Sequence, residues 1–182
     1  MTSQGADMQI GEITSQTFGH IIAFMIPGFI LIWALSLFSP TLASWLGSAE
    51  AAATVGGFFF ATVASVVAGL FVSALRVTCL DSIHHHTGVP LPKFDYSKLQ
   101  ANKDAFLIVI EQLYRYYQFH ANTFIAVILA YIVRLISIKR WPWGEPLLAI
   151  PVLGFELVLF VASRQSLSRS YLRLGQVLGI TT

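Results

Sequence analysis

Charged side chains are scarce in this sequence. Asp, Glu, Lys and Arg make up only 11% of its 182 residues, and 55% of the residues are hydrophobic; an ordinary soluble domain is roughly 25% charged. The net charge of +2, with no basic patch among aromatic side chains, argues against binding to nucleic acid. The composition therefore predicts a single-domain membrane protein.

Cysteine is also nearly absent. Cys79 is the single one, which excludes an intrachain disulfide and a CxxC metal site. We expect a free thiol near a helix end, with palmitoylation as the alternative. The first 17 residues contain Asp7 and Glu12 but neither Lys nor Arg, so the basic segment of a cleavable signal peptide is missing. We therefore expect residues 1–17 to remain as a polar N-terminal tail.

Long apolar runs dominate the rest of the chain. A helix rises about 1.5 Å per residue, so roughly 20 apolar residues cross a hydrocarbon core of about 30 Å. The runs predict an all-α polytopic fold, in which a transmembrane domain of residues 18–163 has four membrane-spanning helices. These spans are expected at about 18–38, 51–75, 116–138 and 146–163. Pro27 and Gly28 predict a kink inside the first span, either a tolerated distortion or a hinge.

The third helix is expected to be longer than the membrane is thick. Ser97 and Gln100 have the spacing of a capping box, which predicts a helix from there to about Ile138. Half of it would extend into the cytoplasm, so residues 76–115 would form an irregular loop to Asn102 and then a helical arm. A polar stripe shares one face of this helix. It consists of Asp104, Glu111, Arg115, Gln118 and Asn122.

Basic residues predict the orientation. All 11 Lys and Arg follow position 75, and with four spans eight of them lie on the side of the termini and the middle loop. The positive-inside rule then places both termini in the cytoplasm. Residues 164–182 are predicted to form a basic amphipathic helix lying on the membrane.

Small residues recur every four positions along the second span. They are Gly57, Ala61, Ser65, Gly69 and Ser73. Such a ladder permits close helix packing, either within the chain or across a homo-oligomer seam.

Few residues have the chemistry of a functional site. Glu156 is a carboxylate inside the fourth span, where an ionisable group needs a partner. Its depth permits a polar cluster with His20, His120 and Asn122, which would be a proton- or ion-responsive site or a structural hydrogen-bond cluster. His84, His85 and His86 are a weak metal candidate, because their spacing fits no standard zinc pattern; the alternative is a solvated run. We expect no metal and no cofactor.

No nucleophile–base pair, phosphate loop or dinucleotide fingerprint is present, so we expect no enzyme activity. The favoured hypothesis is a cell-membrane scaffold or subunit that oligomerises in the lipid bilayer and presents its cytoplasmic loop and helix to a partner protein. The alternative is a small oligomeric channel, transporter or membrane-perturbing effector with a polar site around Glu156.

Overall fold

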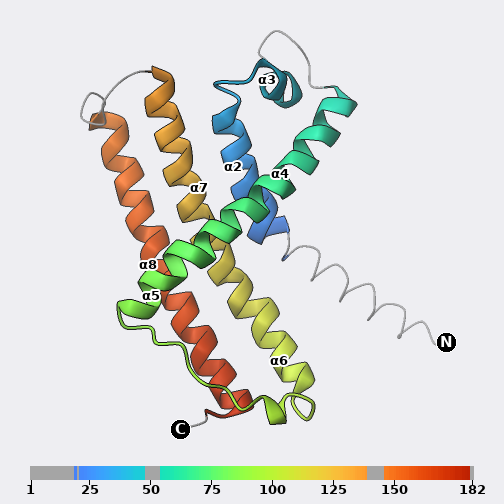
Figure 1. The fold of residues 1–182 in the computed structure, drawn as a ribbon, viewed down its shortest axis with the longest axis vertical. Helices are drawn as coiled ribbons and strands as arrows, with labels where there is room; N and C mark the ends of the chain where they lie inside the picture. Colours follow the sequence, from blue (N-terminus) through green and yellow to red (C-terminus); the bar gives the residue numbers. More distant parts are fainter. Residues whose placement is uncertain (1–18, 20, 48–53, 139–145, 181–182) are drawn as a thin grey trace, which may run out of the picture.

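The computed structural model describes residues 19, 21–47, 54–138 and 146–180, and it confirms the all-α prediction for them. Figure 1 shows the long helices running in alternating directions, with α3 at one end and the C-terminus at the other. In chain order the elements are η1 (Ile21–Met25), α2 (Ile26–Leu35), α3 (Pro40–Leu46), α4 (Val55–Leu75), η2 (Arg76–Leu80), α5 (Asp81–His86), η3 (Tyr96–Lys98), α6 (Lys103–Val109), η4 (Ile110–Tyr114), α7 (Arg115–Ile138) and α8 (Pro146–Leu178).

Three helical stretches are long and apolar enough to cross a membrane: Val55–His86, Lys103–Ile138 and Ala149–Leu178. Only 22–28% of the most apolar window of each is buried inside the structure, which fits helices that turn most of their surface toward lipid. The first predicted span, 18–38, is helical only over Ile21–Leu35 in the described residues and is shorter than the other three. The fold therefore agrees with a membrane protein that has three helices long enough to cross the membrane.

The small-residue ladder of α4 packs against η1, α2 and α3 of the same chain. Four of its rungs are buried, and Ser73 is partly exposed. A Cβ added to Gly69 would collide with the backbone carbonyl of Phe24, and one added to Gly28 would lie 2.5 Å from the amide nitrogen of Gly69. The two backbones thus touch at this crossing, as small residues permit. Of the two alternatives for this ladder, close packing within the chain is the one that these contacts describe.

The helix of the second span continues beyond its predicted end. It runs from α4 through the π-helical turn η2 into α5, so 76–86 is helical and the irregular segment begins at Thr87. The predicted capping box is wrong as well. Ser97 lies in η3 and donates its amide to Asp95 Oδ1, and the third helix begins at Lys103 after Asn102. The irregular connection, which contains Gly88 and the following prolines, is therefore about half as long as predicted.

The C-terminal segment is not a separate surface helix. It continues the fourth apolar run without a break, so α8 is one helix of 33 residues. One row of buried residues faces the rest of the structure along it. The row consists of Glu156, Leu159, Ser163, Leu167, Ser170, Leu174 and Leu178. Because the row continues past Arg164, the predicted membrane-lying helix is instead packed against the protein, chiefly by Leu167, which is fully buried.

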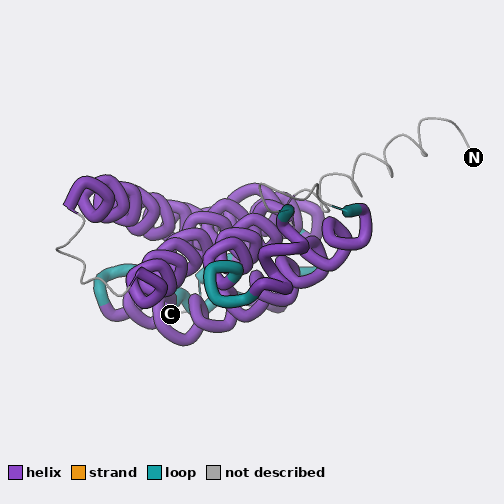
Figure 2. Tube along the Cα trace, turned by 90° about the horizontal axis from the view of Figure 1, so that it is seen from above, coloured by secondary structure: helices purple, strands orange, loops and turns teal. Residues whose placement is uncertain are grey.

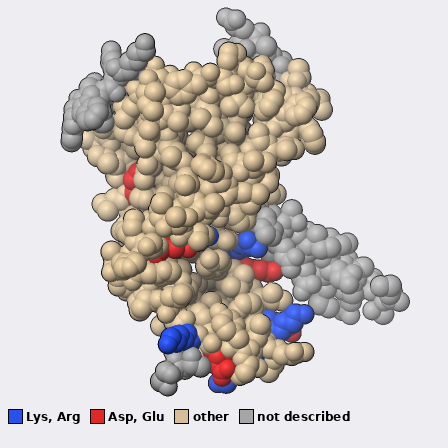
Figure 3. Space-filling model, viewed as in Figure 1, with Lys and Arg blue, Asp and Glu red and all other residues tan. Residues whose placement is uncertain are grey.

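Charge divides the molecule along its long axis. In Figure 3 the upper part of the visible face, over α2, α3 and the upper ends of α4, α7 and α8, is almost free of charged side chains, which gather in the lower part. We call residues 21–75, 116–138 and 146–163 the apolar half, and residues 76–115 and 164–180 the polar lobe. Figure 2, seen from above, shows a molecule that is mostly helix with loops between the helices.

Candidate functional site

A cluster of polar side chains lies where the apolar half meets the polar lobe. Arg76 of η2 is only 2% exposed, and its guanidinium carbon lies 5.2 Å from the ring centre of Tyr117 in α7. Tyr117 is fully buried and donates its hydroxyl to Asp81 Oδ1 of α5. A desolvated cation–π contact contributes about 2 kcal/mol, and a hydrogen bond to a carboxylate is stronger than a neutral one. The contacts therefore hold a buried positive charge against a ring that is itself fixed by a carboxylate.

His84 joins α5 to α8 at the same level. Its Nε2 lies 3.0 Å from Ser163 Oγ, and that hydroxyl donates its single proton to the carbonyl of Phe160 at 2.8 Å. The Ser163 oxygen must then accept the proton of His84 Nε2, which assigns the tautomer. Nδ1 of His84 is buried without a hydrogen-bond partner in the described part of the chain. This imidazole is thus a neutral cross-link between two helices.

Two further contacts fasten α5 and the residue that follows it to α8. His85 Nε2 lies 3.0 Å from the Tyr171 hydroxyl. Arg164 donates Nη1 to Thr87 Oγ1 at 2.9 Å and Nη2 to the Thr87 carbonyl oxygen. The polar lobe is therefore held together by side chains that are 77 to 86 residues apart in sequence.

The three histidines do not converge on one point. His84 contacts Ser163, His85 contacts Tyr171, and His86 Nδ1 lies 2.7 Å from the Ser82 carbonyl of its own helix. Among the described residues, no group of three or more His, Cys, Asp or Glu side chains is arranged to hold a metal ion. Two of these histidines are helix cross-links, which neither the metal hypothesis nor the solvated alternative anticipates.

Asn122 has a specific role in the apolar half. Pro27 lacks the amide hydrogen that would otherwise bond to the carbonyl of Ala23, four residues earlier. Asn122 of α7 is fully buried and donates Nδ2 to that carbonyl oxygen at 2.6 Å. A neighbouring side chain thus satisfies the carbonyl that the proline leaves open, as a membrane interior requires. The predicted distortion appears as the π-helical turn η1 directly before α2.

The other members of the predicted intramembrane cluster have different surroundings. Glu156 is 7% exposed, and neither carboxylate oxygen has a hydrogen-bond partner among the described residues. His120 Nδ1 lies 3.5 Å from Ser166 Oγ. Ser166 lies almost three turns beyond Glu156 on α8. His20 lies outside the described residues. The structure therefore describes no hydrogen bond that links Glu156 to His120 or Asn122.

The predicted polar stripe passes from solvent into the core. Asp104 is exposed, Glu111 and Arg115 are half-buried, and Gln118 and Asn122 are buried. Arg115 donates Nη1 to Gln118 Oε1 at 3.1 Å. The π-helical turn η4 (Ile110–Tyr114) adds a residue to the helix between Asp104 and Arg115, so the stripe after η4 is rotated relative to the part before it.

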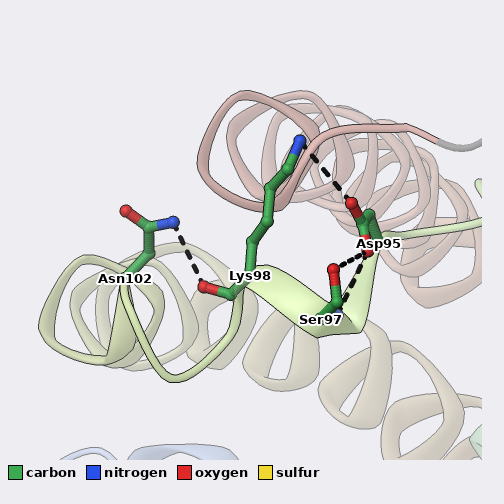
Figure 4. A network of polar contacts seen from close by, with 4 residues as sticks. All are labelled: Asp95, Ser97, Lys98 and Asn102. Atoms are coloured by element: carbon green, nitrogen blue, oxygen red, sulfur yellow. Dashed lines mark hydrogen bonds and ion pairs between the residues drawn. The ribbon is translucent and has the colours of Figure 1, made fainter.

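The far end of the polar lobe is an ordered turn next to a groove. Ser97 donates its amide and hydroxyl to Asp95, and Lys98 Nζ lies 3.6 Å from the same carboxylate (Figure 4). These contacts, the Ser97 hydroxyl above all, lower the pKa of Asp95 below its usual value of 3.8. The groove beside the turn has a volume of about 620 Å³. Its lining residues are Tyr96, Ser97, Leu99, Gln100, Lys103, Phe106 and Leu107.

We call Arg76, Asp81, His84 and Tyr117 the junction cluster. Sequence reasoning missed most of it. The sequence predicts an irregular loop at Arg76 and Asp81. The sequence contains one indication that α8 packs against the polar lobe. Leu167, Leu174 and Leu178 have the spacing of one helix face. No family model matches the sequence, and comparisons with curated proteins and with solved structures found no match.

Proposed function

We propose that this protein is a four-pass membrane scaffold or subunit that holds the polar lobe at the cytoplasmic surface for a partner protein. The observation that carries the proposal is the division into an apolar half and a cross-linked polar lobe. Arg76, Arg115 and Arg164 each stand at the boundary between the halves, one on each long helical stretch. Three arginines at a common level are the arrangement expected where helices leave the hydrocarbon.

The first helix supplies the fourth crossing in this proposal. The backbone amides of Ser36, Leu37 and Phe38 bond back to carbonyls of α2, so the helical path continues beyond Leu35. From Ile21 to Phe38 it measures about 27 Å, close to the roughly 30 Å of a hydrocarbon core. Large side chains on it face outward, for example Phe29 and Trp33. These features support a short span next to α4.

The orientation follows from the basic residues. Eight of the 11 Lys and Arg lie in the polar lobe, which by the positive-inside rule supports a cytoplasmic lobe and cytoplasmic termini. Single cysteines in a Cys79→Ser background test this: Ser44→Cys in α3 and Gln100→Cys in the polar lobe, both exposed positions. With a membrane-impermeant maleimide on intact cells, Ser44→Cys is expected to react and Gln100→Cys to react only after permeabilisation. Reaction of both from the same side would contradict the four-pass arrangement.

The groove at Tyr96–Leu107 is the proposed docking surface. Its lining is mostly apolar and includes Lys103, and its lining residue Ser97 belongs to the hydrogen-bonded turn of Figure 4. An amphipathic helix with an acidic flank suits such a surface, because its apolar side fills the groove and its carboxylates approach the lysine. The ordered turn keeps the surface preformed and so lowers the entropy cost of binding.

A photocrosslinking residue in place of Leu107 tests the surface in native membranes. A defined protein adduct is expected, and Phe106→Glu in the same chain should abolish it. The matched control carries the crosslinker at Val67, an exposed apolar position of α4 that faces lipid. The same adducts from both positions, or an adduct that survives Phe106→Glu, would contradict docking in the groove.

One observation favours the second candidate, a small oligomeric channel or transporter. Both Glu156 oxygens are buried in the apolar half without a hydrogen-bond partner among the described residues, and such a carboxylate is a default site for proton or ion movement. Under this proposal Glu156→Gln changes proton or cation flux in liposomes, whereas Gln165→Glu, at an exposed position of the same helix, does not. Equal flux for wild type and Glu156→Gln would exclude it.

A further inference from the structure

A second groove lies at the boundary between the apolar half and the polar lobe, about 410 Å³ in volume. Its polar lining includes the side chains of Arg164, Ser168 and Arg169, and its apolar lining includes Val89 and Val161. None of the lining residues is acidic. The groove therefore has two positive charges and a hydroxyl beside a hydrocarbon surface.

Arg164 is fixed in place at this groove. Both of its terminal nitrogens donate to Thr87, one to the hydroxyl and one to the carbonyl oxygen. Gly88 has φ of 108°, and a Cβ there would lie 3.1 Å from Arg164 Nη2. A side chain at position 88 would therefore crowd the guanidinium and narrow the groove. The loop thus orients the arginine and leaves space in front of it.

Arg169 is exposed and makes no hydrogen bond with the described residues. It lies on the same helix as Arg164, and both residues line this groove. A guanidinium forms paired hydrogen bonds with phosphate oxygens, which makes two of them a good match for a phosphate group.

The chemistry of the exposed α8 surface changes at this groove. Leu157 and Val161 are 64% and 42% exposed, and one and two turns later the same face carries Gln165 and Ser168. A molecule that contacts both parts needs an apolar chain on one side and an anionic group on the other. Lipid headgroups meet acyl chains at this depth of a bilayer.

We propose that this groove binds the phosphate of an anionic phospholipid, with an acyl chain along the Leu157–Val161 face of α8. Arg164 and Arg169 bind the phosphate oxygens, and the hydroxyl of Ser168 donates a further hydrogen bond. This proposal uses the membrane placement of α8, but it is independent of the partner proposed for the Tyr96–Leu107 groove.

Native mass spectrometry of the full chain in detergent tests the site. The probes are phosphatidic acid, phosphatidylglycerol and phosphatidylcholine, each added alone, and inorganic phosphate as the source without acyl chains. Wild type is expected to retain the anionic lipids in preference to phosphatidylcholine. Arg169→Gln is expected to lower that preference about tenfold, as the loss of a charged hydrogen-bond pair implies.

The matched control is Arg173→Gln, which removes the same charge from the same helix. Arg173 lies outside the groove and donates to Gln176 at 3.0 Å. Its preference for anionic lipid is expected to stay within about twofold of wild type. An equal loss in Arg169→Gln and Arg173→Gln would overturn the site in favour of general surface charge. Retention of inorganic phosphate without any preference among lipids would overturn the lipid assignment. Neither outcome depends on the cysteine-labelling result or on a partner protein.

Discussion

The crossing of α2 and α4 allows one sharp prediction about stability. A Cβ on Gly69 would lie 2.7 Å from the carbonyl carbon of Phe24, and the carbonyl oxygen is closer still, whereas real Cβ contacts begin near 3.0 Å. The obstacle is backbone, so it cannot rotate away and the helices must separate. Overpacking costs about 1–3 kcal/mol, and we take the upper end because backbone atoms meet on both sides. Replacing glycine by alanine within a helix returns up to about 1 kcal/mol, so Gly69→Ala should destabilise by about 2 kcal/mol.

Gly56 of the same helix provides the matched control. A Cβ there meets nothing within 4 Å. Gly56→Ala should therefore be neutral or stabilising by up to about 1 kcal/mol, which separates the two variants by about 3 kcal/mol. The assay is the free energy of unfolding from SDS titration in mixed micelles, followed by circular dichroism.

The mass of each variant in nanodiscs completes the test. If the ladder were a contact between copies, Gly69→Ala would change the oligomer and leave the stability of the single chain unaltered. Equal unfolding free energies for Gly69→Ala and Gly56→Ala would refute the close crossing of α2 and α4.

Three further outcomes follow from single contacts. Asn122→Ala should lower the free energy of unfolding by about 0.5–2 kcal/mol in the same titration, because the Ala23 carbonyl loses its hydrogen-bond donor. No change would mean that another group bonds to this carbonyl. A double-mutant cycle of His84→Ala and Ser163→Ala should give a coupling of about 0.5–1.5 kcal/mol, and strictly additive effects would deny the cross-link. The carboxylate of Asp95 has a lowered pKa in the folded turn, so its contribution is complete above pH 3.8, the usual value, and is lost as the pH falls through the lowered pKa. The protection of the Ser97 amide, which is the intrinsic exchange rate divided by the observed rate at the same pH, should therefore decrease in acid, and Asp95→Asn should remove that change in protection.

The sequence was sufficient for the broad class and for several helices. The apolar runs predicted the helix that begins near Val55 and the helix that ends at Ile138, because a lipid-exposed segment of such composition must be helical. The four-residue spacing of the ladder predicted a close helix contact. It could not say which helix makes the contact, because spacing describes one surface and not its partner.

The junction cluster was harder to predict for a physical reason. Arg76 ends an apolar run, and a charge there is typical of a helix that leaves the membrane into solvent. The helix continues because Leu80 and His84 are buried against α7 and α8, and this tertiary packing is invisible in local sequence. The π-helical turns at 76–80 and 110–114 likewise change the register in a way that no periodic pattern predicts.

The pairing of the chain end with the middle connection has a consequence for biosynthesis. Phe94 pairs with Ile180, and the amide of Asp95 donates to the carbonyl of Gly179 at 3.2 Å. Synthesis proceeds from the N-terminus at roughly 5–20 residues per second, so the first three helices are complete before these partners exist. The middle connection therefore stays unpaired at this end until Gly179 and Ile180 have been synthesised. Closure of the lobe is then a late step of folding, and deletion of Gly179 and Ile180 would leave the connection unpaired at that end.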